Sequence, residues 1–367
     1  MKEFITMGKC AISTDEPSSY YSAQAYRPDA IPDQPRQKQE LNHSRIGQSA
    51  GFRLPWGNTR DVVAPIVFSR ITPKALRRYD KQGDYLDGTG FQGRADHECL
   101  RHAKLAFRSR FLNMLGIFGK GGFWISLPLV FVTYLSVVAD ASNTETWLTV
   151  LDDSLSFFAL TLGTPAVMWL VSATLFKLFP KWCVKIGRGP EWEINRRTGL
   201  VTVWEYPRKR LFRKREEPEV THYPFYEFDG WVRAAADRFG PRFDFVLCHR
   251  YKKLEVHLGE MLSLNRFPNG CYAHWDFIQN YMDVSRPLPD IPQFELYRHL
   301  DPVTAEHDQR SGRPARYWRD MDDKTFREKE DEMHSKVKRI DTERRANLMA
   351  DKVRYAFIYA DEGRTSG

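Results

Sequence analysis

The sequence lacks lysine and arginine over one long stretch. Residues 121–176 contain no basic side chain, although the chain carries 55 lysine and arginine residues in 367. At that average rate, a window of 56 residues would hold about eight of them. Lys120 and Lys177 flank the window, so the basic residues stop and resume abruptly. The gap is not typical of a solvated surface and indicates an environment that excludes charge.

Other signals are also missing, and each absence argues against a class of protein. The cysteines are few, odd in number and widely spaced, which argues against a disulfide framework and favours reduced thiols. The first residues, MKEFITMGKC, hold no apolar run of signal-peptide length, so no cleaved export signal is expected. Neither GKGG nor GRGP has the spacing of a phosphate-binding loop. The five cysteines are Cys10, Cys99, Cys183, Cys248 and Cys271.

Two apolar segments lie inside the window without basic residues. Residues 121–139 and 154–176 are runs of 19 and 23 uncharged residues, and each run contains ten Leu, Ile, Val or Phe. A hydrocarbon core of about 30 Å requires roughly 20 residues of α-helix. We therefore expect two transmembrane helices. The alternative is a pair of helices buried in a large soluble core.

The charges around the two segments predict their orientation. The connecting loop, residues 140–153, contains four acidic residues and no basic one, whereas lysine and arginine are frequent on both outer flanks. Basic residues stay on the cytoplasmic side of a membrane. Both termini are therefore predicted to be cytoplasmic, with only a short periplasmic loop exported. The predicted location is the bacterial inner (plasma) membrane, which the chain crosses twice.

Small residues predict how the two spans pack. Pairs of small residues four positions apart allow helices to approach closely, and a short loop favours an antiparallel hairpin. Ordinary lipid-facing composition is the alternative explanation. Pro128 and Pro165 lie inside the spans, where each removes a helical hydrogen bond. The predicted helix-packing residues are Gly122, Ser126, Ala159 and Gly163.

The cytoplasmic residues before the first span divide by composition. Residues 1–60 are rich in Pro, Ser, Gln and Asp, and we expect a disordered tail. Residues 61–120 form a second segment. Its apolar run 61–71 is a strand or an anchor against the later domain. Its basic run 99–119 predicts a juxtamembrane helix, which either lies along the membrane surface or lengthens the first span.

Residues 182–300 change to the periodicity of strands. WEINRRTGLVTVWEY and RFDFVLCHRYKKLEVHLG each predict a β-hairpin, with Gly199 at a left-handed turn position in the first. PFYEFDGWVRAA is a further candidate strand, and GCYAHWDFIQNYMD is an amphipathic helix that SRPLPDIP ends. We expect a small antiparallel α+β domain capped by a helix, similar in layout to pleckstrin-homology-like domains. Residues 315–357 predict a charged helix that packs on this domain or projects as a binding arm.

Two constellations are candidates for chemistry. Cys248, His249, His257, Cys271 and His274 could bind zinc or supply a thiol nucleophile, but no two close-spaced pairs occur at a familiar interval, and no metal or cofactor is predicted. The basic run RKRLFRKR favours contact with an anionic leaflet, with a solvated loop as the alternative. No nucleic-acid motif accompanies it, so nucleic acid is not an expected partner. The residues of this membrane-surface patch are Arg208, Lys209, Arg210, Arg213, Lys214 and Arg215.

The order of segments resembles a group of two-span bacterial inner-membrane proteins encoded near type VI secretion effectors. The resemblance lies in the apolar hairpin followed by NRRTGLVTVWE, VLCHRYKKLEV and HWDFIQNYMD, over residues 120–289. It implies a non-enzymatic immunity or accessory protein that binds a toxin or secretion component. The alternatives are a membrane-tethered scaffold or anionic-lipid-binding module, and an enzyme using the Cys and His residues. A homo-oligomer is left open.

Overall fold

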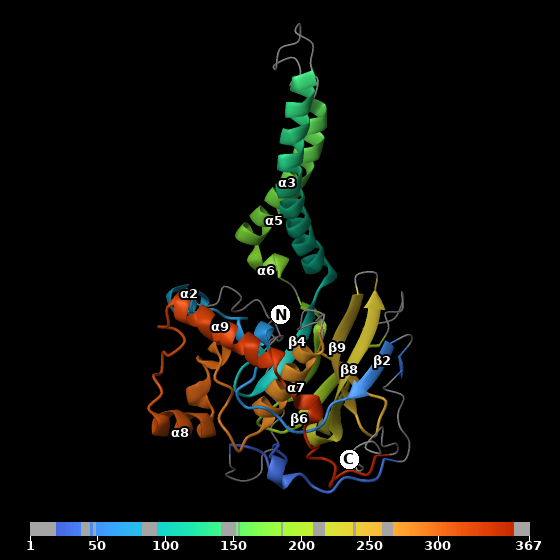
Figure 1. Ribbon diagram of the computed structural model, residues 1–367, viewed down its shortest axis with the longest axis vertical. Coiled ribbons are helices and arrows are strands. Elements are labelled where there is room, and N and C mark those ends of the chain that lie inside the picture. The colour runs from blue at the N-terminus through green and yellow to red at the C-terminus, as the bar shows by residue number, and fades with distance from the viewer. Residues whose placement is uncertain are drawn as a thin grey trace, which may run out of the picture. The chain divides into compact units, whose positions relative to one another are not determined.

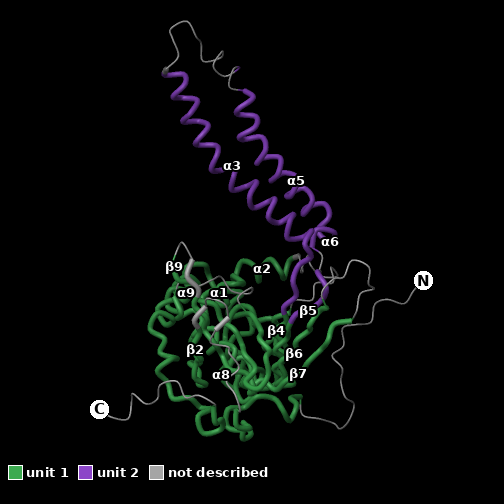
Figure 2. Tube along the Cα trace, turned by 90° about the vertical axis from the view of Figure 1, so that its right-hand side faces the viewer, with its two compact units in different colours: residues 1–81, 94–101, 192–367 green, residues 82–93, 102–191 purple. Residues whose placement is uncertain are grey.

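The computed structural model describes residues 20–37, 45–46, 49–82, 94–140, 152, 155–184, 186–207, 217–237, 240–258 and 267–355. The chain divides into two compact units. Unit 1 comprises residues 1–81, 94–101 and 192–367, and unit 2 comprises residues 82–93 and 102–191. Figure 2 distinguishes the two units by colour.

The described residues contain both helices and antiparallel sheets, which confirms the predicted α+β class. The strands are β1 (Arg45–Ile46), β2 (Ser49–Arg53), β3 (Arg94–Ala95), β4 (Cys99–Leu105), β5 (Ile186–Asn195), β6 (Leu200–Glu205), β7 (Glu219–Pro224), β8 (Phe228–Asp237), β9 (Gly240–His249) and β10 (Glu255–His257). The α-helices are α1 (Pro65–Phe68), α2 (Pro73–Gln82), α3 (Phe107–Asp140), α5 (Thr164–Leu178), α6 (Pro180–Cys183), α7 (Asn269–Met282), α8 (Pro302–Ser311) and α9 (Asp323–Lys338). The shorter helical turns are η1 (Pro28–Ala30), the π-helical η2 (Ala159–Gly163), η3 (Phe225–Glu227), η5 (Pro292–Phe294), η6 (Arg298–Leu300) and η7 (Thr342–Arg344).

One sheet has the strand order β1-β2-β8-β9-β10. Strands β9 and β10 form the hairpin that the alternation predicts, with Val256 paired to Leu247. Strand β8 pairs with β9 on one side and with β2 on the other, where Phe52 meets Val232. Strand β2 lies about 180 residues away along the chain (Phe52 to Val232), so local periodicity does not reveal this pairing.

The other sheet has the order β3-β4-β5-β6-β7 and contains the second predicted hairpin. Trp192 pairs with Val203 and Ile194 with Val201 across β5 and β6. Gly199 closes the turn with φ of +73°, a conformation that favours glycine. A Cβ at Gly199 would also collide with the carbonyl of Gln24, so this turn requires glycine for two reasons.

Helix α7 provides the centre of the core (Figure 1). Every side chain from Cys271 to Met282 is buried, and Trp275 joins residues of both sheets in one apolar cluster. Phe228, Gly230 and Val232 lie on one face of β8 because side chains alternate along a strand. A Cβ at Gly230 would lie 2.8 Å from the Trp275 ring, so glycine permits the close approach of this sheet to α7.

The structure differs from the expectation of a disordered tail over residues 1–60. Tyr26, Ile31, Leu54 and Trp56 are all buried in the main core. The aliphatic residues of this segment are few, but its aromatic rings insert between η3 and α7, with the Trp56 ring centroid 4.8 Å from that of Trp275. A low apolar content therefore did not prevent ordering, because other parts of the chain provide the surface to be buried.

Polar side chains on α7 hold the same N-terminal segment. The Gly57 amide donates to Gln279 Oε1 at 2.9 Å, and the Thr59 amide donates to Asp276 Oδ2 at 2.9 Å. Arg345 Nη1 also donates to Asp276 Oδ2, at 3.0 Å. Residues from near both ends of the chain thus meet on one helix, where they satisfy the buried side chains of Asp276 and Gln279.

The segment before the first span also differs in part from its prediction. Residues 99–105 form strand β4 and not a helix, and α3 begins only at Phe107. The rest of the basic run, from Phe107, lengthens the first apolar helix, because α3 continues without a break to Asp140. This is one of the two alternatives predicted for the run, the other being a separate helix along the membrane surface. Val62, Val63 and Ala64 are buried, so the apolar run 61–71 acts as an anchor.

The predicted boundaries 182–300 do not enclose a complete domain, because β2, β3 and β4 complete the two sheets. Over its described residues 315–355, the charged tail is α-helical only in α9, and η7 adds one short helical turn after it. Helix α9 packs against the rest of unit 1 and does not project from it, since its Phe326 and Val337 are buried. Its exposed face carries the expected i,i+4 pairs Lys324–Glu328 and Glu332–Lys336.

Candidate functional site

The helices of unit 2 are the feature that most distinguishes this chain. Phe107–Ala139 and Leu155–Leu178 are long and apolar enough to cross a membrane, judged by length and composition. Only 6% of the most apolar window of each helix is buried. The alternative of two helices buried in a soluble core therefore does not hold for the described residues.

Three glycines of α3 form its contact with α5. Gly116, Gly119 and Gly122 follow one another at intervals of three residues, and α5 presents Ser172, Trp169 and Pro165 to them in reverse order. A Cβ at Gly119 would lie 2.5 Å from the Trp169 backbone nitrogen and 2.8 Å from the Pro165 carbonyl oxygen. The two helices are therefore antiparallel, and their backbones are in close contact at this point. Figure 1 shows the two helices side by side.

A buried hydroxyl adds a polar contact to this stripe. Ser172 is 3% exposed, and its Oγ donates to the Leu112 carbonyl at 2.9 Å. A serine on one helix that bonds to the backbone of the next is a common contact between helices in an apolar medium. Ser172, which lies opposite Gly116, is thereby bonded to the turn of α3 that precedes Gly116.

The four predicted packing residues occupy different environments. A Cβ at Gly122 would lie 3.3 Å from the Pro165 side chain, so Gly122 belongs to the contact. Ser126 is half-buried, whereas Ala159 is exposed. Nothing lies within 4 Å of a Cβ at Gly163. The structure thus brings only one of the two predicted glycines to the partner helix and adds Gly116 and Gly119.

The two prolines in the spans are accommodated differently. Pro128 lies inside α3 without ending it. Pro165 lies in the first turn of α5, directly after the π-helical stretch η2, and the Thr164 amide donates to the Leu160 carbonyl at that junction. Local π-helical adjustments of this kind restore backbone bonds near a proline.

An aromatic and a cation mark the end of the pair where α3 begins. Arg108 Cζ lies 4.0 Å from the centroid of the Trp182 ring, and Arg108 Nη2 donates to the Trp182 carbonyl at 2.5 Å. Tryptophan and arginine at one level are typical of a membrane–water interface. Arg110, Lys177 and Lys181 lie near the same end of the helices.

The Cys and His residues considered for metal or thiol chemistry do not converge. Cys248 and His257 lie on one face of the β9–β10 pair, whereas Cys271 and His274 lie on α7, which packs against the other face. No group of three or more His, Cys, Asp or Glu suited to a metal occurs among the described residues.

The environments of these groups shift their protonation. Burial raises the pKa of the Cys248 thiol above its ordinary value, which disfavours the nucleophilic thiolate. Burial lowers the pKa of His274 to about 3, so its ring is neutral at pH 7. The carboxylates of Asp244 and Glu255, which accept from the protonated ring and lie 3.8 and 3.6 Å from its nitrogens, raise the pKa of the half-exposed His257 to about 9.

One buried carboxylate in unit 1 has an excess of cationic partners. Asp229 accepts from Arg250 Nη2 at 2.6 Å and from Trp56 Nε1 at 3.1 Å, and Arg53 Nε lies 3.4 Å away. Burial alone would raise the pKa of Asp229, but the charges of Arg250 and Arg53 outweigh it and lower the pKa. Tyr355 completes the cluster, with its ring 4.0 Å from Arg53 Cζ.

A second buried pair fastens the β5–β6 turn. Arg196 and Asp301 both have fully buried side chains, and Arg196 Nε lies 3.2 Å from Asp301 Oδ1. The remaining Arg196 donors reach the carbonyl oxygens of Tyr281, Asp283 and Arg286 at 2.5, 2.9 and 2.6 Å. Every arm of the guanidinium thus has an acceptor, which makes the pair a structural clamp and not a ligand site.

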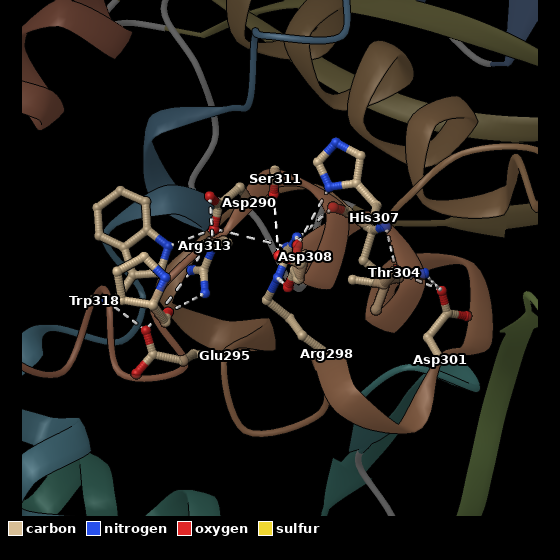
Figure 3. Close-up of polar contacts among 12 residues, drawn as sticks. Asp290, Glu295, Arg298, Asp301, Thr304, His307, Asp308, Ser311, Arg313 and Trp318 are labelled. Atoms are coloured by element: carbon tan, nitrogen blue, oxygen red, sulfur yellow. Dashed lines mark hydrogen bonds and ion pairs between the residues drawn. The ribbon is translucent and has the colours of Figure 1, made fainter.

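Further ion pairs connect the segment that follows α7 (Figure 3). Arg298 binds Asp308 through two contacts of 2.6 Å, and Arg313 binds Asp290 through contacts of 3.0 and 2.8 Å. The buried Glu295 accepts from the Trp318 and Arg319 amides at 2.5 and 3.1 Å. These pairs satisfy one another and leave no open carboxylate for a substrate among the residues drawn.

The six residues of the predicted membrane-surface patch lie outside the described residues, as does the predicted periplasmic loop except Asp140 and Asp152. The clamp residues Arg196 and Asp301 were missed from sequence because they lie 105 positions apart. Gly116 and Gly119 carried a usable signal, since their spacing of three continues to Gly122.

Comparison of the chain with protein-family models, with curated proteins and with solved structures finds no match.

Proposed function

We propose that this protein is a non-enzymatic bacterial inner-membrane protein, held by an α3–α5 hairpin, that binds a protein partner through unit 1 in the cytoplasm. The observation that carries the proposal is the pair of exposed apolar helices. In water their outward side chains would cost about 25 cal/mol for each Å² of apolar surface, and lipid removes that cost. The basic flanks and the acidic loop support cytoplasmic termini.

Membrane insertion is tested by fractionation of cells that express the full chain. We expect the protein to remain in the membrane pellet after alkaline carbonate washing and to enter the detergent fraction. Recovery in the soluble fraction after ultracentrifugation would exclude the hairpin.

Orientation needs a separate measurement. Alkaline phosphatase is active only when exported, whereas green fluorescent protein fluoresces in the cytoplasm. We expect phosphatase activity from an insertion within residues 141–151 and fluorescence from fusions at either terminus. The reverse pattern would overturn the proposed topology but not the membrane anchoring.

The resemblance in segment order supports a more specific role, namely that of an immunity or accessory protein of a type VI secretion effector. The partner would then be a toxin or secretion component. A short periplasmic loop offers little surface, so we propose that protection acts on the cytoplasmic face or within the bilayer. Deletion of the gene should sensitise cells to a toxin encoded beside it, and the toxin should co-purify with the protein.

Two alternatives remain distinguishable from this role. A membrane-tethered scaffold or anionic-lipid-binding module rests on the basic run Arg208–Arg215, and its test is binding to vesicles with and without phosphatidylglycerol. The pleckstrin-homology-like layout, with strands followed by α7, belongs to the same alternative. An enzyme would lose activity when Cys248, His257, Cys271 and His274 are substituted together, whereas the proposed role would persist.

A further inference from the structure

The register of the helix pair sets the depth of each residue relative to the others. Gly116 faces Ser172 in the antiparallel pair. Phe111 lies five residues before Gly116 on α3, and Lys177 lies five residues after Ser172 on α5. These two residues are therefore at the same height along the helix pair. Lys120 lies nine residues further along α3 than Phe111, which is about 14 Å at 1.5 Å per residue. The Lys120 amine lies 6.0 Å from the ring centroid of Trp169, in agreement with this register.

The outward side chains show which part of the pair faces lipid. Between the levels of Phe111 and Lys120, six outward large apolar residues of the two helices are 44–61% exposed. If Lys120 marked the edge of the hydrocarbon, all of them would face headgroups or water. Placing one lysine with a long aliphatic stem inside the hydrocarbon costs less free energy than exposing those apolar side chains to headgroups or water. The residues concerned are Phe111, Met114, Ile117, Phe118, Leu170 and Val171.

Lys120 therefore lies inside the apolar zone and not at its edge. It is exposed, between the outward residues Ile117 and Trp124. No ion pair to Lys120 occurs among the residues that the structure describes. Beside it, Gly121 has nothing within 4 Å of a Cβ position, so another helix can approach α3 closely there.

We propose that Lys120 binds a carboxylate on a transmembrane helix of a different protein. An ionisable group inside a membrane is retained where it pairs with a group of opposite charge. Residues 111–139 and 154–176 contain no Asp or Glu, so a second copy of this chain has no carboxylate to offer at this depth. The partner helix is thus identified by an aspartate or glutamate near its middle.

The inference rests on the proposed membrane anchoring, and its test separates the two. Full-length protein is reconstituted in phosphatidylcholine vesicles with a biotinylated polyleucine peptide of about 20 residues, which carries one central aspartate or, as the control, only leucine. Flotation with the vesicles reports anchoring. After mild solubilisation, streptavidin capture reports association with the peptide.

We expect the aspartate peptide to capture at least about fivefold more protein than the all-leucine peptide, in line with an intramembrane polar contact. Lys120→Leu should abolish the preference, Lys120→Arg should retain it, and the matched control Lys177→Leu should leave it unchanged. Equal capture by the two peptides, with normal flotation, would overturn the proposal for Lys120 alone. Loss of the preference when phosphatidylglycerol is added would also overturn it, because lipid phosphate would then be the anion that Lys120 prefers.

Discussion

Helix α7 and the α3–α5 pair show opposite relations between residue type and burial. Helix α7 contains Asp276, Gln279 and Asn280, yet all three are buried. Helix α3 carries Trp124, Ile125 and Leu129, which are 57, 72 and 60% exposed. In unit 1, backbone and side chains from distant segments replace water around the polar groups. In unit 2 the described residues leave these outward apolar side chains uncovered, which is consistent with a solvent other than water.

The contacts within each region follow from this difference. Unit 1 uses buried ion pairs such as Arg196 with Asp301, because an unpaired charge in a core is very costly. The helix pair uses glycine and serine, because apolar side chains gain nothing from leaving lipid and only close backbone packing distinguishes one arrangement from another. The following changes test this comparison, in order of decreasing expected effect.

Loss of the Arg196 clamp should have the largest effect. Arg196→Met leaves Asp301 buried without its cation, and we expect a loss of about 3–5 kcal/mol in the free energy of unfolding. The matched control is Arg197→Met, since the Arg197 side chain is 41% exposed and contacts the Tyr20 ring at 5.1 Å. We expect a loss of about 1 kcal/mol or less in the control. The measurement is urea unfolding in mild detergent, followed by tryptophan fluorescence. Similar losses in the two variants would contradict the clamp.

Replacing a glycine of α3 by alanine should have an intermediate effect on stability, and the effect should depend on which side of the helix the added methyl group occupies. Gly119→Ala forces the backbones of α3 and α5 apart, and we expect a loss of about 1–3 kcal/mol from overpacking. Gly121→Ala meets open space and should be neutral or stabilising by up to about 1 kcal/mol through helix propensity. Titration with SDS, followed by circular dichroism, compares the two. A Gly121 variant as unstable as the Gly119 variant would place the helix contact elsewhere.

At neutral pH the smallest expected effect is that of His274, because its contribution to stability is lost only as the pH falls below about 6.5. Its folded pKa of about 3 lies below the ordinary value of about 6.5, so between these values the unfolded chain binds the proton and the folded chain does not. Stability is therefore complete above pH 6.5 and falls below it, by about 1.4 kcal/mol per pH unit from this group.

Two histidine variants separate the acid side of the stability profile from its alkaline side. His274→Phe should flatten the acid side of the profile, since the ring lies 6.3 Å from both Phe245 and Phe277 and an apolar ring suits that site. His257 has a raised pKa, so its stabilising pairs are complete below pH 6.5 and are lost as the pH rises through about 9. His257→Gln should therefore change only the alkaline side. An acid profile of His274→Phe identical to that of the native protein would contradict the assignment.

Some features were predictable because they depend on neighbours in the chain. Gly199 between two alternating runs predicts the β5–β6 hairpin, and the structure contains it with Ile194 opposite Val201. The alternation around Cys248 and Val256 likewise predicts β9 and β10. The run from Gly121 to Phe176 identifies the apolar helices by length and composition.

Other features depend on partners far along the chain. Leu54 and Trp56 occur in a segment whose composition is typical of disorder, yet both side chains are fully buried, and Trp56 packs against Phe225 of η3 and Trp275 of α7. The basic run at 99–105 has the spacing of a helix but forms β4, because a sheet offers it backbone partners. Helical propensity is a weak preference that tertiary pairing readily overrides.

Sequence by itself determined where this protein is apolar, where it alternates and where its charges stop, because these properties are local and solvent acts on each of them directly. Only the tertiary structure decided which buried charges meet, as in Arg196 with Asp301, and which glycines of α3 touch α5. Those contacts depend on the relative placement of distant segments to within a few tenths of an ångström, and no local pattern encodes that placement.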